Sequence, residues 1–351
     1  EPYITKKLAL FGFLLGVGLG NHLTLLAVGV PFLFWLWVAL GRQRLMSPWM
    51  IGAFFMGLCV YIYLPIRASH TPPINWGDAS TLDGFLWMLS GRVYQEYVFG
   101  IPLETIPERL LSWARFAFLQ FNPFGIFIGL IGSVPLLKRE RWFLGASASS
   151  MGILSVYSIT YRTVDYQVIL ISAFMLFAVW IGIGFFWIAS SISDWIKDSK
   201  ELWPLHPLRP LLSRSLLILS ISAFGAMPVA STILNYPSQN LRDDHQAYEY
   251  ASNVMSFLPD GSLVLSHEES KVFSLWYMRY VEKTNKDVAT IAVPLLQFDW
   301  YLSDLHARFP DRVPADTPAD TTKALKILVE HNYSGARVFF TYRSRLLEDL
   351  F

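Results

Sequence analysis

Residues 168–190 read VILISAFMLFAVWIGIGFFWIAS, and this stretch without a charged side chain decides the fold class. A membrane-spanning helix requires roughly 20 consecutive apolar residues to cross the hydrocarbon core of a bilayer. Lipid offers no hydrogen bonds, so the backbone must satisfy its polar groups within the segment. The stretch therefore predicts a membrane-spanning helix.

Six further apolar runs repeat this pattern, and polar segments separate them. They lie at about 8–20, 24–40, 48–65, 113–136, 142–160 and 214–234. The first two are short, so we expect them to be tilted, or broken at the glycine-rich segment 16–20. Together the runs predict a polytopic α-helical membrane domain of about seven spans over residues 1–235.

The composition fits a membrane protein and narrows its partners. The chain is 53% hydrophobic and 16% charged, and its 13 Trp and 26 Phe suit the aromatic belts of membrane interfaces. A net charge of +1 argues against nucleic acid as a partner. Cys59 is the only cysteine, which excludes an intrachain disulfide. Because the chain begins at a glutamate and stops just after an apparent strand and turn, we expect a fragment of a longer protein.

The basic residues of the loops predict the orientation of the spans. One set of connections carries most of them: Lys6, Lys7, Arg42, Arg44, Lys138, Arg139, Arg141, Lys197, Lys200, Arg209 and Arg214. The other set, residues 66–112 and 161–167, holds four. Since cytoplasmic loops are enriched in lysine and arginine, we expect a cytoplasmic N-terminus. Both loops of the second set and the C-terminal domain then share the outer, extracytoplasmic face.

The outer loop 66–112 is too long to be a simple connector. Its many aromatic and apolar side chains argue against disorder, and residues 83–89 predict a short helix lying in the membrane interface. The residues at 105–108 favour the start of a further helix from about residue 106.

Residues 236–351 have the character of a soluble α/β domain. Strand-like runs at 263–266, 288–293 and 337–342 alternate with helical segments. Such alternation predicts a parallel sheet with Rossmann-like winding. No glycine-rich phosphate fingerprint follows any strand, so nucleotide binding is not expected.

Polar clusters lie at the predicted outer ends of the spans, and each has a functional and a structural interpretation. His22 either faces a cavity or partner, or is a hydrogen-bond hub between two half-spans. Arg67 either binds a lipid phosphate or extends to the headgroups. Asn75 and Trp76 precede Asp78, which is either a catalytic or metal-binding carboxylate or a turn residue after glycine.

The last cluster is the short connection 161–166. Arg162 and Asp165 are expected to form a local ion pair, and a functional role gains weight because this connection shares the outer face. The sequence contains no zinc-ligand spacing, nucleophile elbow or phosphate loop, so no metal ligand is assigned.

These clusters, in this order, resemble one family of membrane proteins. The motifs are Gly20-Asn21-His22-Leu23-Thr24, Leu64-Pro65-Ile66-Arg67, Asn75-Trp76-Gly77-Asp78, and Asp165 before a span ending Gly182-Ile183-Gly184. The soluble segment adds Phe273-Ser274-Leu275-Trp276-Tyr277, Lys286-Asp287-Val288 and Trp300-Tyr301. The family is a bacterial multi-pass group of formerly unknown function, which also includes the animal endoplasmic-reticulum O-mannosyltransferase acting on plexins and related receptors. The resemblance covers most of the chain.

The resemblance implies a type-C (GT-C-like) glycosyltransferase in a bacterial inner membrane. Such an enzyme takes sugar from a polyprenyl-phosphate carrier at the outer membrane face and transfers it to a protein hydroxyl. The implied partners are membrane lipid, the lipid-linked donor and a protein acceptor. The family's acidic base or metal ligand belongs to a first outer loop, which we expect upstream of residue 1. A divalent metal stays open, and no other cofactor is assigned.

The same resemblance gives the candidate residues their roles. Asp78 and Asp165 are candidate catalytic carboxylates. The candidates for binding the substrate or the lipid phosphate are His22, Arg67, Asn75, Trp76 and Arg162.

Two other classes of protein stay open. One is a transporter or flippase for a lipid-linked molecule, although the sequence shows no convincing internal repeat and almost no intramembrane charge. The other is a membrane anchor whose soluble domain binds a partner.

Overall fold

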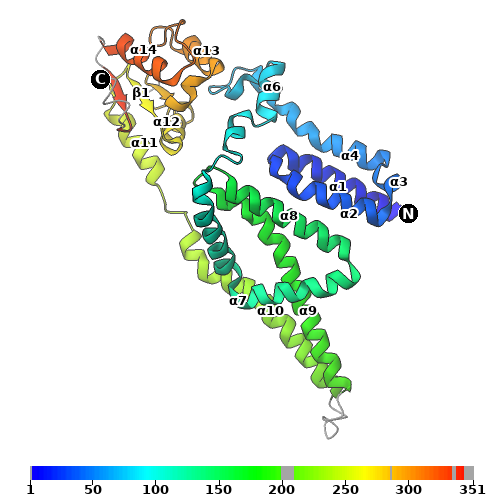
Figure 1. The fold of residues 1–351 in the computed structure, drawn as a ribbon. Coiled ribbons are helices and arrows are strands. Elements are labelled where there is room, and N and C mark those ends of the chain that lie inside the picture. The colour runs from blue at the N-terminus through cyan, green and yellow to red at the C-terminus, as the bar shows by residue number, and fades with distance from the viewer. Residues whose placement is uncertain (1, 199–208, 285–286, 334–336, 344–351) are drawn as a thin grey trace. The chain divides into compact units, whose positions relative to one another are not determined.

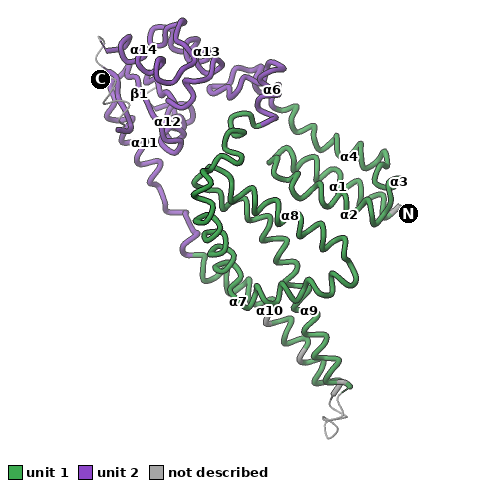
Figure 2. Tube along the Cα trace, in the orientation of Figure 1, with its two compact units in different colours: residues 1–63, 91–236 green, residues 64–90, 237–351 purple. Residues whose placement is uncertain are grey.

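The computed structural model describes residues 2–198, 209–284, 287–333 and 337–343 (Figure 1). The chain forms two compact units, which Figure 2 distinguishes by colour. The helical unit comprises residues 1–63 and 91–236, and the α/β unit comprises residues 64–90 and 237–351. Residues 64–90 therefore pack with the C-terminal segment, although they lie between two spans in the sequence. Lys200 and Lys286, named above in a basic loop and in a motif, lie outside the described residues.

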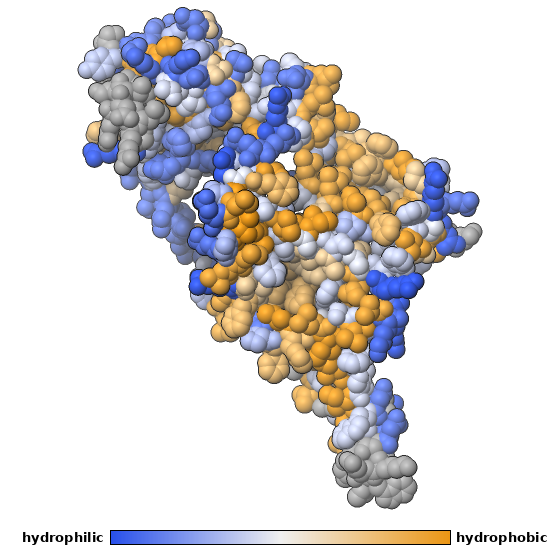
Figure 3. Space-filling model, in the orientation of Figure 1, coloured by the Kyte–Doolittle hydropathy of each residue, from blue (hydrophilic) through white to orange (hydrophobic). Residues whose placement is uncertain are grey.

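Seven helical segments of the described chain are long and apolar enough to cross a membrane, as the sequence predicts. They are formed by α1 (Pro2–Asn21), α2 (Leu26–Leu40), α4 (Pro48–Leu58) with α5 (Tyr63–Ala68), α7 (Ile106–Arg139), α8 (Arg141–Thr160), α9 (Leu170–Asp198) and α10 (Arg209–Gln239). On the face drawn in Figure 3, apolar side chains cover much of the helical unit, as expected where helices meet lipid. The chain is an integral membrane protein.

Short helices lie between the spans or form part of them. They are η1 (Leu23–Leu25), α3 (Arg42–Leu45), η2 (Cys59–Ile62), η4 (Arg92–Tyr97), η5 (Leu103–Thr105) and η6 (Tyr166–Ile169). The helix predicted from about residue 106 begins at Ile106, as α7.

Glycines bring pairs of spans into backbone contact. A Cβ atom added at Gly16 of α1 would clash with the backbone carbonyl oxygen of Phe54 in α4. Gly132 of α7 and Gly184 of α9 meet in the same way. Membrane helices associate through such small residues, because lipid tails give no hydrophobic drive for helix pairing. Since α1 is continuous through the segment 16–20, this segment is a packing surface and not a break in the helix.

The long helix α7 consists of two segments joined by a kink. Asn122 has a positive φ of 48°, and Pro123 has no N–H to continue the helical hydrogen bonds. The Asn122 Oδ1 atom accepts hydrogen bonds from the backbone N–H groups of Phe124 at 2.9 Å and Gly125 at 3.3 Å. The side chain therefore caps the second segment, as an N-cap residue does.

Within its described residues, the α/β unit contains a parallel sheet of three strands in the order β2-β1-β3. Its C-terminal elements are α11 (Gln246–Phe257), β1 (Leu263–Ser266), α12 (Glu269–Tyr280), β2 (Ala289–Ala292), η8 (Val293–Gln297), α13 (Asp299–Arg308), α14 (Thr321–Tyr333) and β3 (Val338–Phe340). All residues of β1 and β2 are buried, which is typical of a parallel sheet covered on both faces. Rossmann-like winding requires a larger, doubly wound sheet, so that part of the expectation is not confirmed.

The core of the α/β unit fixes the position of α13. Tyr301, in the first turn of α13, is only 1% exposed. The backbone N–H of Ala292, at the end of β2, donates to the Tyr301 hydroxyl at 2.8 Å. This bond ties the start of α13 to the sheet and holds the residues on either side of Tyr301 in place.

Candidate functional site in the loop segments

An aromatic cluster joins the segment 64–90 to the start of α13 within the α/β unit. Trp76 lies in η3 (Trp76–Asp78), and Trp87 lies in α6 (Leu82–Leu89), the short helix predicted at 83–89. The ring centroid of Trp300 lies 5.8 Å from that of Trp76 and 6.1 Å from that of Trp87, and Phe298 stacks on Trp300 at 6.0 Å. Because aromatic side chains bury large apolar areas in such contacts, the segment is docked on α13.

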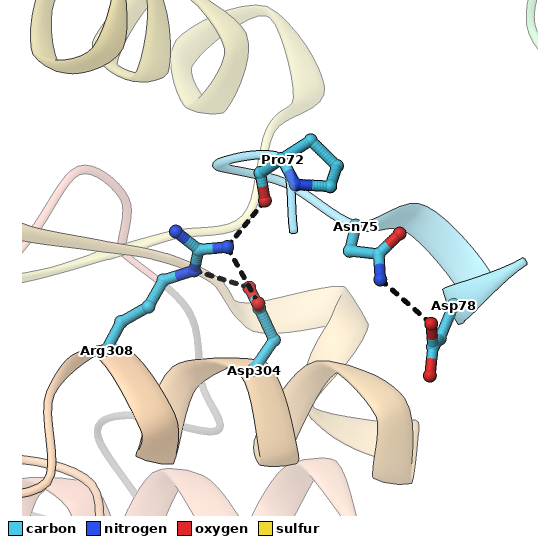
Figure 4. A network of polar contacts seen from close by, with 5 residues as sticks. All are labelled: Pro72, Asn75, Asp78, Asp304 and Arg308. Carbon is cyan, nitrogen blue, oxygen red and sulfur yellow. Dashed lines mark hydrogen bonds and ion pairs between the residues drawn. The ribbon is translucent and has the colours of Figure 1, made fainter. Parts of the chain in front are cut away.

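A polar contact holds the same segment. Arg308 of α13 bonds to both carboxylate oxygens of Asp304, one helical turn earlier, at 2.9 Å each. Its Nη2 atom also donates to the backbone carbonyl of Pro72 at 2.5 Å (Figure 4). A bidentate carboxylate fixes the direction of a guanidinium. Arg308 is therefore an oriented donor for the loop backbone.

Asp78 lies at the centre of a tight turn. Its Oδ1 atom accepts hydrogen bonds from Asn75 Nδ2 at 2.9 Å and from Ser80 Oγ at 2.5 Å, the first of which is drawn in Figure 4. Gly77 and Asp78 both have positive φ, of 69° and 47°. A Cβ atom at Gly77 would lie 2.8 Å from the Trp87 ring, so only glycine fits there. The structure thus brings Asn75 and Asp78 together in the geometry of a turn.

In the helical unit, the connection 161–166 packs on η4. The backbone N–H of Arg162 donates to the carbonyl of Tyr97 at 3.0 Å, and the guanidinium lies 5.3 Å from the centroid of the Tyr97 ring. Arg162 Nη2 is 3.7 Å from Glu96 Oε1. Because the Arg162 side chain turns toward η4, it pairs with Glu96, and the pair expected with Asp165 is not formed in the described structure. Asp165 is exposed, and its carbonyl accepts the first hydrogen bond of η6.

His22 forms the junction between α1 and η1. Its Nδ1 atom accepts the backbone N–H of Thr24 at 3.2 Å and lies 2.8 Å from the Thr24 hydroxyl. Since a backbone N–H donates to Nδ1, that nitrogen carries no proton in this arrangement. The geometry is that of a local hydrogen-bond hub between two spans.

Sequence reasoning did not single out Arg109, in the first turn of α7. Its guanidinium carbon lies 3.7 Å from the centroid of the Tyr166 ring, and Nη2 donates to the Thr163 carbonyl at 3.2 Å. Within the described residues, Arg109 Nη1 and the Thr163 hydroxyl are buried without a hydrogen-bond partner. A buried donor left unpaired is costly, so the two groups mark a place for an acceptor. The sequence feature that could have identified Arg109 is a basic residue at the start of a long, mainly apolar helix.

The predicted site residues fall into two groups. The helical unit holds His22, Arg162 and Asp165, and the α/β unit holds Arg67, Asn75, Trp76 and Asp78. In the described structure, Asn75 and Asp78 are the two of these that share a side-chain hydrogen bond. Arg67 is exposed in the last turn of α5. Over the described ranges, no group of three or more His, Cys, Asp or Glu side chains is arranged to hold a metal ion.

The fold and these contacts define a class: a multi-pass integral membrane protein whose loop between two spans is docked on a C-terminal α/β domain. Comparison with known proteins places the chain more closely. A family described as TMEM260-associated domain 2 matches residues 247–325. No solved structure matches the chain.

Two curated relatives cover most of the chain. Protein O-mannosyl-transferase tmem260 of Dictyostelium discoideum is 24% identical over 320 residues, which are 83% of this chain and 38% of the relative. Protein O-mannosyl-transferase TMEM260 of Mus musculus is 24% identical over 330 residues, 87% of this chain and 44% of the relative. The chain thus spans less than half the length of these relatives. The similarity to the animal O-mannosyltransferase, which the sequence motifs predicted, is confirmed.

Proposed function

We propose that the full-length protein is a membrane glycosyltransferase that moves mannose from a polyprenyl-phosphate carrier to a hydroxyl group of a protein acceptor at the outer membrane face. The observation that carries this proposal is the similarity to two O-mannosyl-transferases over 83% and 87% of the chain. So long a match includes both the spans and the α/β domain. The spans would give the enzyme access to a donor that resides in the bilayer.

The reaction requires a group that takes the proton of the acceptor hydroxyl while its oxygen attacks the anomeric carbon. The bond from that carbon to the carrier's phosphate oxygen breaks, and a single displacement inverts the anomeric centre. Of the two candidate carboxylates, Asp165 is exposed, whereas Asp78 accepts two hydrogen bonds within its own turn. Asp165 is therefore the better-placed base in this chain. Burial raises the pKa of the nearby Tyr161 to about 12, and the neighbouring Tyr157 acts in the same direction.

The leaving phosphate requires positive charge and fixed hydrogen-bond donors. Arg109 meets both needs, because contacts to Thr163 and Tyr166 hold its guanidinium while Nη1 remains unpaired. A phosphate oxygen near Nη1 and the Thr163 hydroxyl would satisfy both buried groups. Arg162, in the same connection, adds a second positive charge. We assign the binding of the donor's phosphate group to Arg109, Thr163 and Arg162.

Changing Arg109 to lysine is expected to raise the KM for polyprenyl-phosphate mannose about tenfold. Lysine keeps the charge but loses the planar fork, and a hydrogen bond to a charged group is worth about 1.5–3 kcal/mol. The measurement is transfer of labelled mannose to protein by membranes containing the full-length protein. Arg92→Lys, at an exposed position in η4, is the matched control and should leave the KM unchanged. If the wild-type protein transfers no mannose, the proposed function is wrong; an unchanged KM in Arg109→Lys removes only Arg109 from it.

Reporter fusions test the proposed orientation. Fusions after Ser47, Gly91, Arg139 and Gln239 are expected to report inside, outside, inside and outside, because the basic connections face the cytoplasm. Ser47, Arg139 and Gln239 lie at or next to the end of a span, and Gly91 lies between the spans Pro48–Ala68 and Leu103–Arg139. A cytoplasmic signal from the Gln239 fusion would contradict both the orientation and the outer location of the α/β unit.

A further inference from the structure

Three arginines lie close together in the α/β unit: Arg279 of α12, Arg308 at the end of α13, and Arg312 shortly after it. Burial lowers the pKa of Arg279, and the nearby charges of Arg312 and Arg308 act in the same direction. Arg279 and Arg312 also share one aromatic neighbour, since their guanidinium carbons lie 4.6 Å and 5.9 Å from the centroid of the Phe309 ring. The three positive charges therefore form one cluster.

Among the described residues, two of the three arginines form an ion pair with a carboxylate. Arg308 pairs with Asp304 at 2.9 Å, and Arg312 pairs with Asp287 at 2.7 Å. Arg279 forms no ion pair with any described residue, and its Nη1 atom is buried without a hydrogen-bond partner. Among the described residues, Arg279 is therefore the guanidinium of the three without an ion-pair partner, and the nearby charge of Asp287, which Arg312 binds, acts on it only from a distance.

A partly buried guanidinium without an ion-pair partner is unfavourable unless another group balances its charge. Burial removes water from a charged group, and an unpaired donor then loses its hydrogen bond as well. The ring faces of Phe309 and Tyr280, 4.6 Å and 5.4 Å from the guanidinium, offset part of this cost through cation–π attraction. They do not give the Nη1 atom of Arg279 a hydrogen-bond acceptor. An acceptor that carries negative charge would supply this hydrogen bond and balance the charge.

We propose that Arg279, with Arg308 and Arg312 beside it, binds a phosphate group, either free or as part of a lipid headgroup. A phosphate carries one or two negative charges and offers several acceptor oxygens, which suit the fork geometry of arginine. Arg308 also donates to the carbonyl of Pro72, so the ligand would lie beside the residue that holds the segment 64–90. The proposal rests on the α/β unit alone and is independent of the proposed enzymatic activity.

The test uses the full-length protein in a neutral detergent at constant ionic strength. Inorganic phosphate and a soluble short-chain phosphatidic acid are titrated separately, and binding is measured by calorimetry and by the rise in Tm. We expect saturable binding of at least one of the two by the wild type. Arg279→Met, which retains an apolar side chain against Phe309, should raise the Kd at least tenfold. Arg242→Met removes an exposed charge from the same unit and should leave the Kd unchanged.

Two further measurements keep the test decisive. Without phosphate, Arg279→Met should be at least as stable as the wild type, because the variant removes a buried charge that lacks a partner. If that variant does not fold, Arg279→Lys should still weaken binding several-fold, since lysine loses the fork. Binding of phosphatidic acid alone would identify a lipid as the source of the phosphate. Absence of binding by the wild type, or equal Kd values in the wild type and both Arg279 variants, would overturn the proposal.

Discussion

Replacing Gly184 with leucine is expected to lower the free energy of unfolding by about 3 kcal/mol or more, because overpacking against backbone cannot be relieved by a change of side-chain rotamer. A Cβ atom at Gly184 would clash with the backbone carbonyl of Ile128 and lie 2.8 Å from the backbone nitrogen of Gly132. Both atoms belong to α7, so the whole helix would have to move away from α9. Because membrane helices associate through close packing, the loss would extend along the α7–α9 interface.

Gly182 provides the matched control on the same helix. A Cβ atom at Gly182 would meet nothing within 4 Å, so Gly182→Leu should change stability little. Thermal unfolding in detergent, followed by tryptophan fluorescence and by monodispersity after heating, compares the two variants. Equal Tm values for Gly182→Leu and Gly184→Leu would contradict the assigned interface.

The seven spans could be predicted from the sequence because hydropathy over one segment is a local property. Residues 168–190, for example, lie almost entirely within α9. The role of the glycine-rich segment 16–20 could not be predicted, because it depends on α4, with which the segment packs. The strand runs at 263–266 and 288–293 were local signals too. The winding of a sheet depends on how distant segments connect, and three strands leave the Rossmann-like part of the prediction unconfirmed.

In the candidate site, too, features set by neighbouring residues could be predicted and features set by distant residues could not. The turn at Gly77 and Asp78 follows from short-range chemistry, since glycine adopts positive φ and aspartate bonds to neighbouring groups. The pairing of Arg162 was predicted wrongly, because its partner Glu96 comes from a distant segment. Arg109 was not recognised as a candidate, because its unpaired Nη1 atom is defined by the connection that folds over α7. Residues whose chemistry depends on long-range neighbours are the ones that sequence patterns leave out.

The docking of the segment 64–90 depends on one side chain, Trp87, as the α7–α9 interface depends on Gly184. Its ring lies 5.5 Å from Phe298 and 6.1 Å from Trp300 by centroid, and it also covers Gly77. Trp87 therefore stands between the Asn75–Asp78 turn and the start of α13. Trp87 is not among the residues that make up the core around β1 and β2.

We therefore expect Trp87→Ala to release the segment while the remainder of the α/β unit stays folded. Truncating a buried aromatic side chain costs about 3–5 kcal/mol, and for half-buried Trp87 we expect about 3 kcal/mol. When opening is fast relative to cleavage, proteolysis follows the open population, so trypsin should cut after Arg67 of the segment about 100-fold faster. Leu82→Ala, at a 74% exposed position of the same helix, should leave the rate unchanged. An unaltered cleavage rate in Trp87→Ala would show that the contacts of Trp76 with Trp300 and of Arg308 with Pro72 hold the segment without Trp87.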